Sequence, residues 1–403
     1  MRHGSILLPL VILSILTFLD RIAISVAAPR IQQELQITPD RWGWVIGAFV
    51  LAYGIFELPT GALGDVLGQR KVLTRIVLWW SAFTALTGAA TSFVGLVAIR
   101  FLFGIGEAGA YPNIAGVISQ QFPLKERART QGYIWAASRL GGALSPLIVV
   151  PLQRWLGWRV AFSVLGLMGV LWTVWWWVGL HASPEGAVPL RKAHVAIPWR
   201  TLFRSPQLWL IFTMYFCYAW GSWFFFGWFP TYLTKSAGFS EGEMAFLSAL
   251  PFLAGAAGNV AGGFLSDRMV ARFGAKHGRR LIGCLSLAGS AVLLVGLSQA
   301  KGKIAIAILS TLGFGVADLM LPTAWAICLD IGGAFAGSVS GFMNTAGQLG
   351  GFLCSIAYGY VVQATGSYNL PLAMVASMVL ISAFLFAKID ASKPIAWQDV
   401  IQK

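Results

Sequence analysis

The residues of this chain that could do chemistry are a few charged side chains inside long apolar segments. The stretch 98–112 reads AIRFLFGIGEAGAYP and carries Arg100 and Glu107. Seven residues on a helix of 3.6 residues per turn return to nearly the same face, roughly 10 Å along the axis. A charge near the centre of a bilayer costs about 2.5–3.5 kcal/mol, so it usually has a partner or a function. The stretch therefore predicts a fixed cation and a titratable carboxylate on one stripe of one helix.

Asp20 and Arg21 form a second charged pair in apolar surroundings. Neighbouring residues on a helix point about 100° apart, so two different walls would receive them. Arginine presents a rigid fork of donors to a carboxylate and stays charged when partly dehydrated, so we expect Arg21 and Arg100 to bind an anionic group. Burial and a nearby arginine act on a carboxyl in opposite directions, which makes Asp20 and Glu107 the candidates for proton transfer. The alternative is that the four charges only neutralise one another in a packed bundle.

The composition places these charges in a membrane protein. Of the 403 residues, 57% are hydrophobic and 11% are charged, whereas soluble domains carry about 25% charged residues. The net charge of +14 does not indicate nucleic acid, because the basic residues gather in predicted cytoplasmic loops. The four cysteines lie in apolar runs without metal-ligand spacing, so we expect no bound metal and no disulfide framework. No Walker loop or enzyme motif is present, so we expect neither a cofactor nor enzyme activity.

Apolar runs of about the 20 residues needed to cross a bilayer occur about twelve times. We predict an all-α membrane protein whose twelve transmembrane helices form two six-helix bundles, 1–181 and 207–403, joined by a cytoplasmic linker, 182–206. Most of the 29 Lys and Arg residues fall on one side, which predicts that both termini are cytoplasmic. The predicted spans are 6–28, 42–64, 73–93, 95–119, 131–153, 158–181, 207–235, 243–265, 280–299, 303–326, 335–362 and 370–389.

The two halves carry a weak internal repeat. Residues 61–65 (GALGD) follow the second span, and residues 263–267 (GFLSD) follow the eighth. Each stretch precedes a basic loop, which reads GQRK at 68–71 in the first half. Repeated halves are typical of transporters, whose substrate sites lie near the midplane between the repeats. The candidate residues of a conformational motif in the first half are Gly61, Asp65, Gly68, Arg70 and Lys71.

These residues give the chain a resemblance to the major facilitator superfamily over essentially its full length. Within it, the chain resembles the anion:cation symporters, which include bacterial galactonate, hexuronate and glucarate transporters and are related to sialin and the vesicular glutamate transporters. The matching stretches are 20–29, 100–112, 157–159 and 330–333, together with Asn344. The resemblance implies that Asp20 and Glu107 couple protons, and that the loop at 68–71 latches the halves in an outward-open state.

Several further side chains inside apolar runs are candidates for substrate contact. Tyr53 could hydrogen-bond a hydroxyl or carboxylate, and Arg139 could bind substrate or pair with Glu57. Asn344 and Gln348, four residues apart, share a helix face, while Trp220 and Trp223 could pack on a sugar face. Packing or gating is the alternative for each of them. Asp318, in a glycine-rich part of the tenth predicted span, could belong to a gate or to a structural pair, and the sequence does not decide between them or assign a role to Asp330.

Together, these features predict a proton-coupled symporter of an organic anion, with sugar acids such as hexonates or hexuronates as the expected substrates. Its partners would be the anion, protons and membrane lipid but no nucleic acid, and we expect a monomer in the bacterial inner membrane. One alternative is a symporter of another small carboxylate, such as phthalate or tartrate. The other is a non-transporting membrane sensor built on the same fold.

Overall fold

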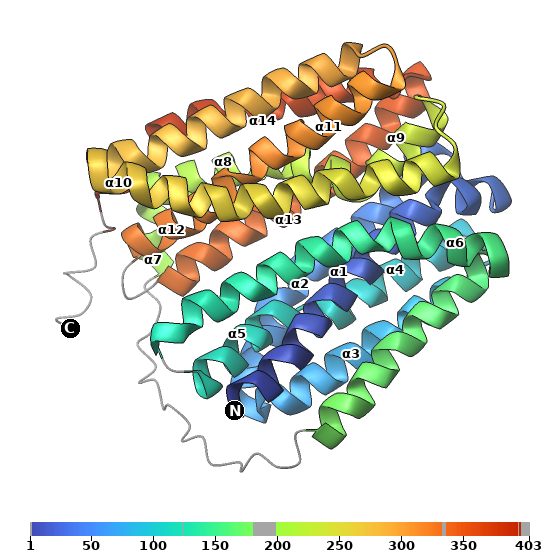
Figure 1. Ribbon diagram of the computed structural model, residues 1–403, viewed down its shortest axis with the longest axis horizontal. Helices are drawn as coiled ribbons and strands as arrows, with labels where there is room; N and C mark the ends of the chain where they lie inside the picture. Colours follow the sequence, from blue (N-terminus) through green and yellow to red (C-terminus); the bar gives the residue numbers. More distant parts are fainter. Residues whose placement is uncertain (1, 123, 180–198, 333–335, 394, 396–403) are drawn as a thin grey trace. The chain divides into compact units, whose positions relative to one another are not determined.

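The computed structural model describes residues 2–122, 124–179, 199–332, 336–393 and 395. The regular elements of these residues are α-helices and one π-helical turn, η1 (Figure 1). In chain order they are α1 (Arg2–Glu34), α2 (Pro39–Leu67), α3 (Gln69–Thr87), α4 (Phe93–Glu107), α5 (Ala110–Gln121), α6 (Leu124–Gly179), α7 (Trp199–Arg204), α8 (Pro206–Trp223), η1 (Phe224–Trp228), α9 (Phe229–Lys235), α10 (Glu241–Gln299), α11 (Lys303–Asp318), α12 (Met320–Gly332), α13 (Ala336–Thr365) and α14 (Leu370–Lys388).

The described residues include seven helical stretches long and apolar enough to cross a membrane. Two of them, in α6 and α10, cover 49 and 59 residues, more than the roughly 20 that one crossing needs. Gly157 in α6 (φ 77°) and Gly274 in α10 (φ 75°) break these long helices. Glycine adopts positive φ without steric cost, and each break falls between two predicted spans. The predicted all-α membrane fold is confirmed, whereas twelve spans and cytoplasmic termini remain predictions.

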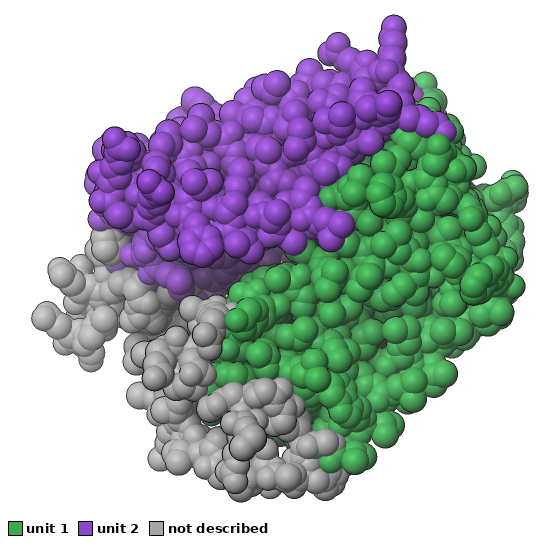
Figure 2. Space-filling view, in the orientation of Figure 1, with its two compact units in different colours: residues 1–189, 226–250, 355–366 green, residues 190–225, 251–354, 367–403 purple. Residues whose placement is uncertain are grey.

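Contacts divide the chain into two compact units (Figure 2). Unit 1, drawn green, comprises residues 1–189, 226–250 and 355–366, and unit 2, drawn purple, comprises residues 190–225, 251–354 and 367–403. Most of the predicted linker lies outside the described residues, and α7 forms at its end. The domain boundaries 1–181, 182–206 and 207–403 therefore remain predictions.

Unit 1 is built on close helix pairs. α1 and α3 pack against α6, and α2 packs against α4. A Cβ atom on Gly104 would lie 2.6 Å from the carbonyl oxygen of Phe49, so only glycine permits this approach of α4 to α2. The Ser145 hydroxyl of α6 donates to the Leu19 carbonyl of α1 at 2.8 Å. These contacts fix the backbones around the charged residues of α1 and α4.

Unit 1 also contains an ion cluster formed by Arg30 of α1, Arg154 of α6 and Glu241 of α10, which we call the Glu241 cluster. Arg30 donates through Nε and Nη2 to the two Glu241 oxygens at 2.6 and 2.7 Å, and Arg154 Nε donates at 3.1 Å. Ser240 and Glu243 form a capping box at the start of α10, with bonds of 2.8 and 3.3 Å. The cap holds Glu241 in the first turn, where the helix dipole favours a carboxylate.

In unit 2, α10 and α11 meet backbone to backbone. A Cβ atom on Gly258 would collide with the Gly315 carbonyl oxygen, and one on Gly262 would collide with the Leu319 carbonyl oxygen. Small residues spaced along a membrane helix allow this close approach. The seam places the end of α11 directly against the middle of α10.

Candidate functional site

A buried ion pair lies at the centre of the charged residues of unit 1. Arg21 of α1 donates through Nε to Glu107 Oε1 at 3.0 Å, and its Nη2 donates to the same oxygen. Arg21 is 8% exposed and Glu107 is fully buried. Glu107 Oε2 has no hydrogen-bond partner among the described residues. One carboxylate oxygen thus holds the guanidinium, and the other is left open to a proton.

A helix break positions Glu107. It is the last residue of α4, and Gly109 adopts a left-handed conformation (φ 83°) before α5 begins. A Cβ atom on Gly109 would lie 2.7 Å from the Thr60 side chain, so space as well as φ requires glycine there. Pro112 lacks an N–H group and cannot restore the regular helical bonding across the break. The charged stripe predicted on one continuous helix therefore ends at this break.

Arg100 lies deeper in the same region and has different surroundings. It is 2% exposed, and its guanidinium carbon lies 4.3 and 5.0 Å from the ring centroids of Phe103 and Phe49. Its Nε has no hydrogen-bond partner among the described residues. It acts electrostatically on Glu107 and Asp20. Arg100 thus supplies positive charge to both acids while its guanidinium packs against two adjacent aromatic rings.

Asp20, 4% exposed, completes the charge cluster. The indole N–H of Trp80 and the hydroxyl of Thr84, both on α3, lie close to its carboxyl without meeting hydrogen-bond geometry. Both groups are buried polar donors. The structure therefore brings together the four predicted charges Asp20, Arg21, Arg100 and Glu107, and adds two α3 side chains that the sequence analysis did not propose.

Aromatic residues enclose the Arg21 guanidinium. Its central carbon lies 4.8 Å from the rings of both Phe18 and Tyr53, which keeps the predicted ligand Tyr53 beside the cation. The predicted cation Arg139 of α6 is 7% exposed and lies 5.6 Å from the Phe226 ring. Cation–π contacts of this kind stabilise a cation that water does not reach.

Tyr111 is a member of this region that the sequence analysis missed. Its ring stacks on Trp135 at 4.8 Å, and its hydroxyl lies 3.2 Å from that of Ser14. Ser14 donates its own proton to the Ile134 carbonyl, so Tyr111 is the donor in the pair. Tyr111 follows Glu107 by four residues, a spacing that predicts one face of a continuous helix from sequence; in the structure the break at Gly109 lies between them.

The other predicted substrate residues belong to unit 2. Trp220 of α8 is 6% exposed, and Asn344 and Gln348 of α13 are half-buried. Trp220 Nε1 and Gln348 Oε1 hydrogen-bond to nothing among the described residues. Trp223 packs directly on Gly351 of α13. Unit 2 therefore contains an indole donor (Trp220) and a carboxamide acceptor (Gln348) that could each form a further hydrogen bond.

The conformational motif is only partly described. Gly68 ends α2 and precedes α3 with φ 87°, which explains the glycine. Arg70 donates to the Trp177 carbonyl at 2.8 Å, while Lys71 is exposed. A Cβ atom on Gly61 would lie 2.9 Å from the Pro112 side chain. The side chain of Asp65 lies outside the described residues, so the predicted latch remains a prediction.

The corresponding motif in unit 2 gives Asp330 a partner. Arg279 of α10 contacts Asp267 at 3.3 Å and Asp330 of α12 at 3.2 Å, and it also donates to Ser266 at 2.8 Å. One guanidinium thus joins the repeated GFLSD stretch to the end of α12. Asp330, left without a role by the sequence, belongs to this network.

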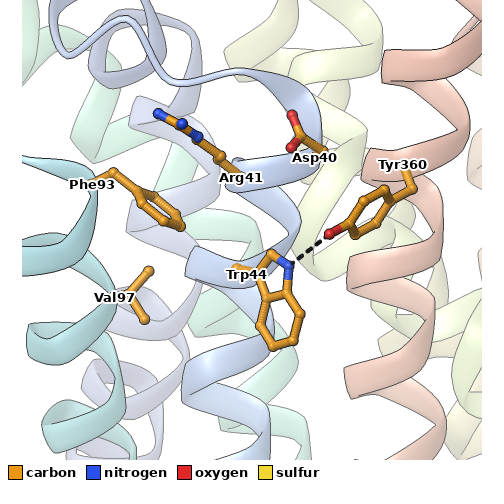
Figure 3. A pocket seen from close by; sticks show the side chains of 6 residues that line it. All are labelled: Asp40, Arg41, Trp44, Phe93, Val97 and Tyr360. Carbon is orange, nitrogen blue, oxygen red and sulfur yellow. Dashed lines mark hydrogen bonds between the residues drawn. The ribbon is translucent and has the colours of Figure 1, made fainter.

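None of the four charged residues of the cluster lines a cavity of about 480 Å³ in unit 1 (Figure 3). Trp44 Nε1 donates to the Tyr360 hydroxyl at 3.4 Å across it, and Arg41 lies 5.6 Å from the Phe93 ring. Its lining is completed by Asp40 and Val97. Arg41, Trp44 and Tyr360 are exposed, so this is a surface hollow and the buried charge cluster is the better candidate site.

In the described part of the chain, no group of three or more His, Cys, Asp or Glu side chains is placed to hold a metal ion.

Residues 10–355 match the Major Facilitator Superfamily. The chain belongs to this superfamily. It is therefore a multi-pass membrane protein of a transporter superfamily, and its relatives are not enzymes. The resemblance to the anion:cation symporters is confirmed by the relatives described next.

Three relatives of this superfamily member are named as transporters of organic anions. It is 36% identical over 373 residues to a probable sulfoacetate transporter, SauU, of Cupriavidus necator, covering 88% of this chain and 86% of that protein. It is 30% identical over 380 residues to the hexuronate transporter of Bacillus subtilis, covering 90% and 89%. It is 29% identical over 378 residues to a probable L-galactonate transporter of Escherichia coli, covering 89% and 83%.

A solved structure shares the fold. The crystal structure of a bacterial homologue of the human lysosomal transporter Spinster, in an inward-facing and occupied conformation, matches with a TM-score of 0.82. The sequences are 20% identical, and the match covers 95% of this chain and 96% of that one. At this identity the likeness supports the helical transporter fold and nothing finer.

Proposed function

We propose that this protein is a proton-coupled symporter that carries an organic anion across a membrane by alternating access. The observation that carries the proposal is the buried pair of Arg21 and Glu107, in which one carboxylate oxygen holds the guanidinium and the other is open. A buried cation that can exchange one carboxylate for another suits a carrier of carboxylic acids. Asp20 and Glu107 are the proposed proton carriers.

The mechanism follows from the competition for Arg21. While Glu107 is ionised, it occupies the guanidinium. Protonation removes the charge of Glu107 and with it most of the attraction, so Arg21 becomes available to a substrate carboxylate. The fork of donors matches that carboxylate, and Tyr53 beside it suits a substrate hydroxyl. When substrate leaves on the other side, Arg21 returns to Glu107 and the proton is released.

Sugar acids, hexonates or hexuronates, are the proposed substrates, because hexuronate and L-galactonate transporters are among the relatives. A second candidate class is that of smaller carboxylates, which the 36% identity to a probable sulfoacetate transporter favours. Both classes present a carboxylate to Arg21. We further propose that the protein works as a monomer in a bacterial inner membrane.

Uptake into proteoliposomes tests the proposal. With an inward proton gradient, the wild type should accumulate a labelled hexonate, hexuronate or sulfoacetate above its external concentration. Glu107→Gln should lose this accumulation and retain binding or substrate exchange. The amide has nearly the shape of the carboxyl group but cannot take up or release a proton. Binding without any accumulation by the wild type would indicate the sensor alternative.

The matched control is Glu243→Gln, which makes the same chemical change in the capping box of α10. It should leave accumulation intact. Concentrative uptake by Glu107→Gln equal to that of the control would remove Glu107 from the mechanism.

A further inference from the structure

Unit 2 contains a buried carboxyl that the proposed mechanism has not used. Asp318 of α11 is 0% exposed. The Tyr218 hydroxyl of α8 donates to its Oδ1 at 2.9 Å, and Asn259 Nδ2 of α10 donates to its Oδ2 at 3.1 Å. Each carboxyl oxygen therefore has a donor from a different helix.

Asp318 lies where α11 passes into α12 through one turn residue, Leu319, whose backbone keeps helical dihedral angles. Asp318 is the last residue of α11, and the N–H of Leu319 bonds to Val316 at 3.3 Å, three residues back, before α12 begins. Pro322 lacks the N–H that would bond the Asp318 carbonyl in a regular helix. Interrupted membrane helices are the usual sites of ion and substrate binding in transporters.

The packing around Asp318 is tight and leaves no room for a bulkier neighbour. A Cβ atom on Gly255 of α10 would lie 2.6 Å from Asp318 Oδ2 and from the Phe314 ring. The carboxyl is thus held against a helix backbone in the membrane interior, where an ionisable group is costly. Asparagine would bridge the same helices without that cost, so the acid itself needs an explanation.

The explanation comes from comparison with Glu107. α4 has 15 residues and ends at Glu107, while α11 has 16 residues and ends at Asp318. Both helices begin the fourth predicted span of their half, and both carboxyls are fully buried. A proline follows each acid within five residues. The two carboxyls therefore occupy corresponding positions in the two repeats, each at the last residue of the first helix of its span.

We propose that Asp318 is a second carboxyl that takes up and releases one proton in each transport cycle. The carboxylate takes a proton from water on one side of the membrane and gives it to water on the other. Tyr218 and Asn259 stabilise the ionised form after one proton is released and before the next is taken up. Tyr218 is the titratable group that bonds to it from α8, while α10 presents Asn259 and Gly255. The inference rests on the proposed proton coupling.

Asp318→Asn tests it, with Asp40→Asn as the matched control at the start of α2. Protons and labelled substrate are counted together during uptake into proteoliposomes. With a gradient of one pH unit, each coupled proton contributes a factor of about ten to the accumulation ratio. The variant should therefore accumulate about tenfold less substrate and carry about one proton fewer per substrate, with exchange as fast as in the control.

The outcomes are distinguishable. If substrate accumulation by the wild type does not depend on the proton gradient, the proposed function itself is wrong. If the wild type responds and Asp318→Asn keeps the same proton count, Asp318 carries no proton. If exchange and accumulation fall in proportion, Asp318 is structural and the inference is wrong.

Tyr218→Phe gives a second test that does not depend on the folding of Asp318→Asn. It removes one donor to the carboxylate and keeps the ring that packs on Tyr215 at 5.3 Å. Hydrogen bonds to a carboxylate favour its charged form, so uptake should become half-maximal at a higher pH, by about one unit. Tyr215→Phe is the control. An unchanged pH profile in Tyr218→Phe would overturn the inference.

Discussion

Arg21 and Arg100 are both buried cations, but their contacts differ. Arg21 is held by a carboxylate that can be neutralised, whereas Arg100 packs against two adjacent rings, Phe49 and Phe103. Protonation of Glu107 would release Arg21 to bind a substrate carboxylate. At Arg100 a substrate carboxylate would have to approach a guanidinium that already packs on these rings. The geometry favours Arg21 as the primary anion ligand and keeps Arg100 as a candidate.

Arg21→Lys should weaken binding of the acid about tenfold or more, because lysine keeps the charge and loses the fork. Arg100→Lys should have the smaller effect on recognition of the carboxylate. The measurement is the affinity for the acid relative to its neutral amide or lactone, in the wild type and in each variant.

Arg204→Lys, at an exposed position in α7, is the control for this comparison. Equal discrimination between acid and amide in the wild type and Arg21→Lys would mean that the carboxylate is recognised elsewhere. Arg139 would then be the next cation to test.

The charged members of the site could be predicted from sequence because an ionisable residue in an apolar run is conspicuous by type alone. Trp80 and Thr84 could not, because an indole and a hydroxyl are common in membrane helices. Their relevance comes only from the packing of α3 beside Asp20. Tyr111 could be predicted in part. The sequence shows its spacing from Glu107, but it does not show that the ring stacks on Trp135.

Among the elements, the contact of α10 with α11 depends most on single glycines. Gly258→Ala would push a methyl group into the Gly315 carbonyl, so the helices must move apart. Overpacking of this kind costs about 1–3 kcal/mol. We expect the melting temperature of the purified protein to fall by several degrees, together with transport.

Gly263→Ala is the matched control in the same helix. Its added Cβ atom would lie 4.0 Å from Pro322, an ordinary contact. Alanine favours a helix by up to about 1 kcal/mol over glycine, so this variant should be as stable as the wild type or more so. Equal melting temperatures for the two variants would show that α10 and α11 can move apart at Gly258 without loss of stability.

The element breaks show where prediction from sequence stops. Hydropathy predicted apolar spans because the bilayer imposes a length and a composition. It did not place the ends of α4 and α11 at Glu107 and Asp318, because the apolar character continues past both residues. Hydropathy also did not predict how contacts divide the chain into two units, because residues 226–250 and 355–366 join unit 1 through tertiary packing alone.

At the scale of the whole molecule, the Glu241 cluster joins Glu241, from the predicted second half, to Arg30 and Arg154, from the predicted first half, within unit 1. Arg30 and Arg154 lie on the side predicted to be external. Trp228 of η1 donates to the Ser355 carbonyl at 3.1 Å in the same unit, and Gly227 packs on Ile46. We infer that these contacts close the external side and must separate when it opens.

Glu241→Gln should therefore increase opening of the external side. The paired side chains are 28–45% exposed, and pairs of this kind contribute about 0.2–1 kcal/mol each. A cysteine at position 46, introduced after the four native cysteines are replaced by alanine, should react about threefold or more faster with an external thiol reagent. Glu243→Gln is the control. Equal rates in both variants would exclude the cluster from the closure.

The π-helical turn at Phe224–Trp228 affects any alignment of this chain with its relatives. A regular α-helix turns about 100° per residue, and a π-helical turn holds an extra residue before the rotation is completed. Side chains after Trp228 therefore face as they would if one residue had been removed from a regular helix. A relative with an unbroken α-helix here aligns correctly only with a one-residue gap. Roles transferred without that gap would fall on the wrong face of α9.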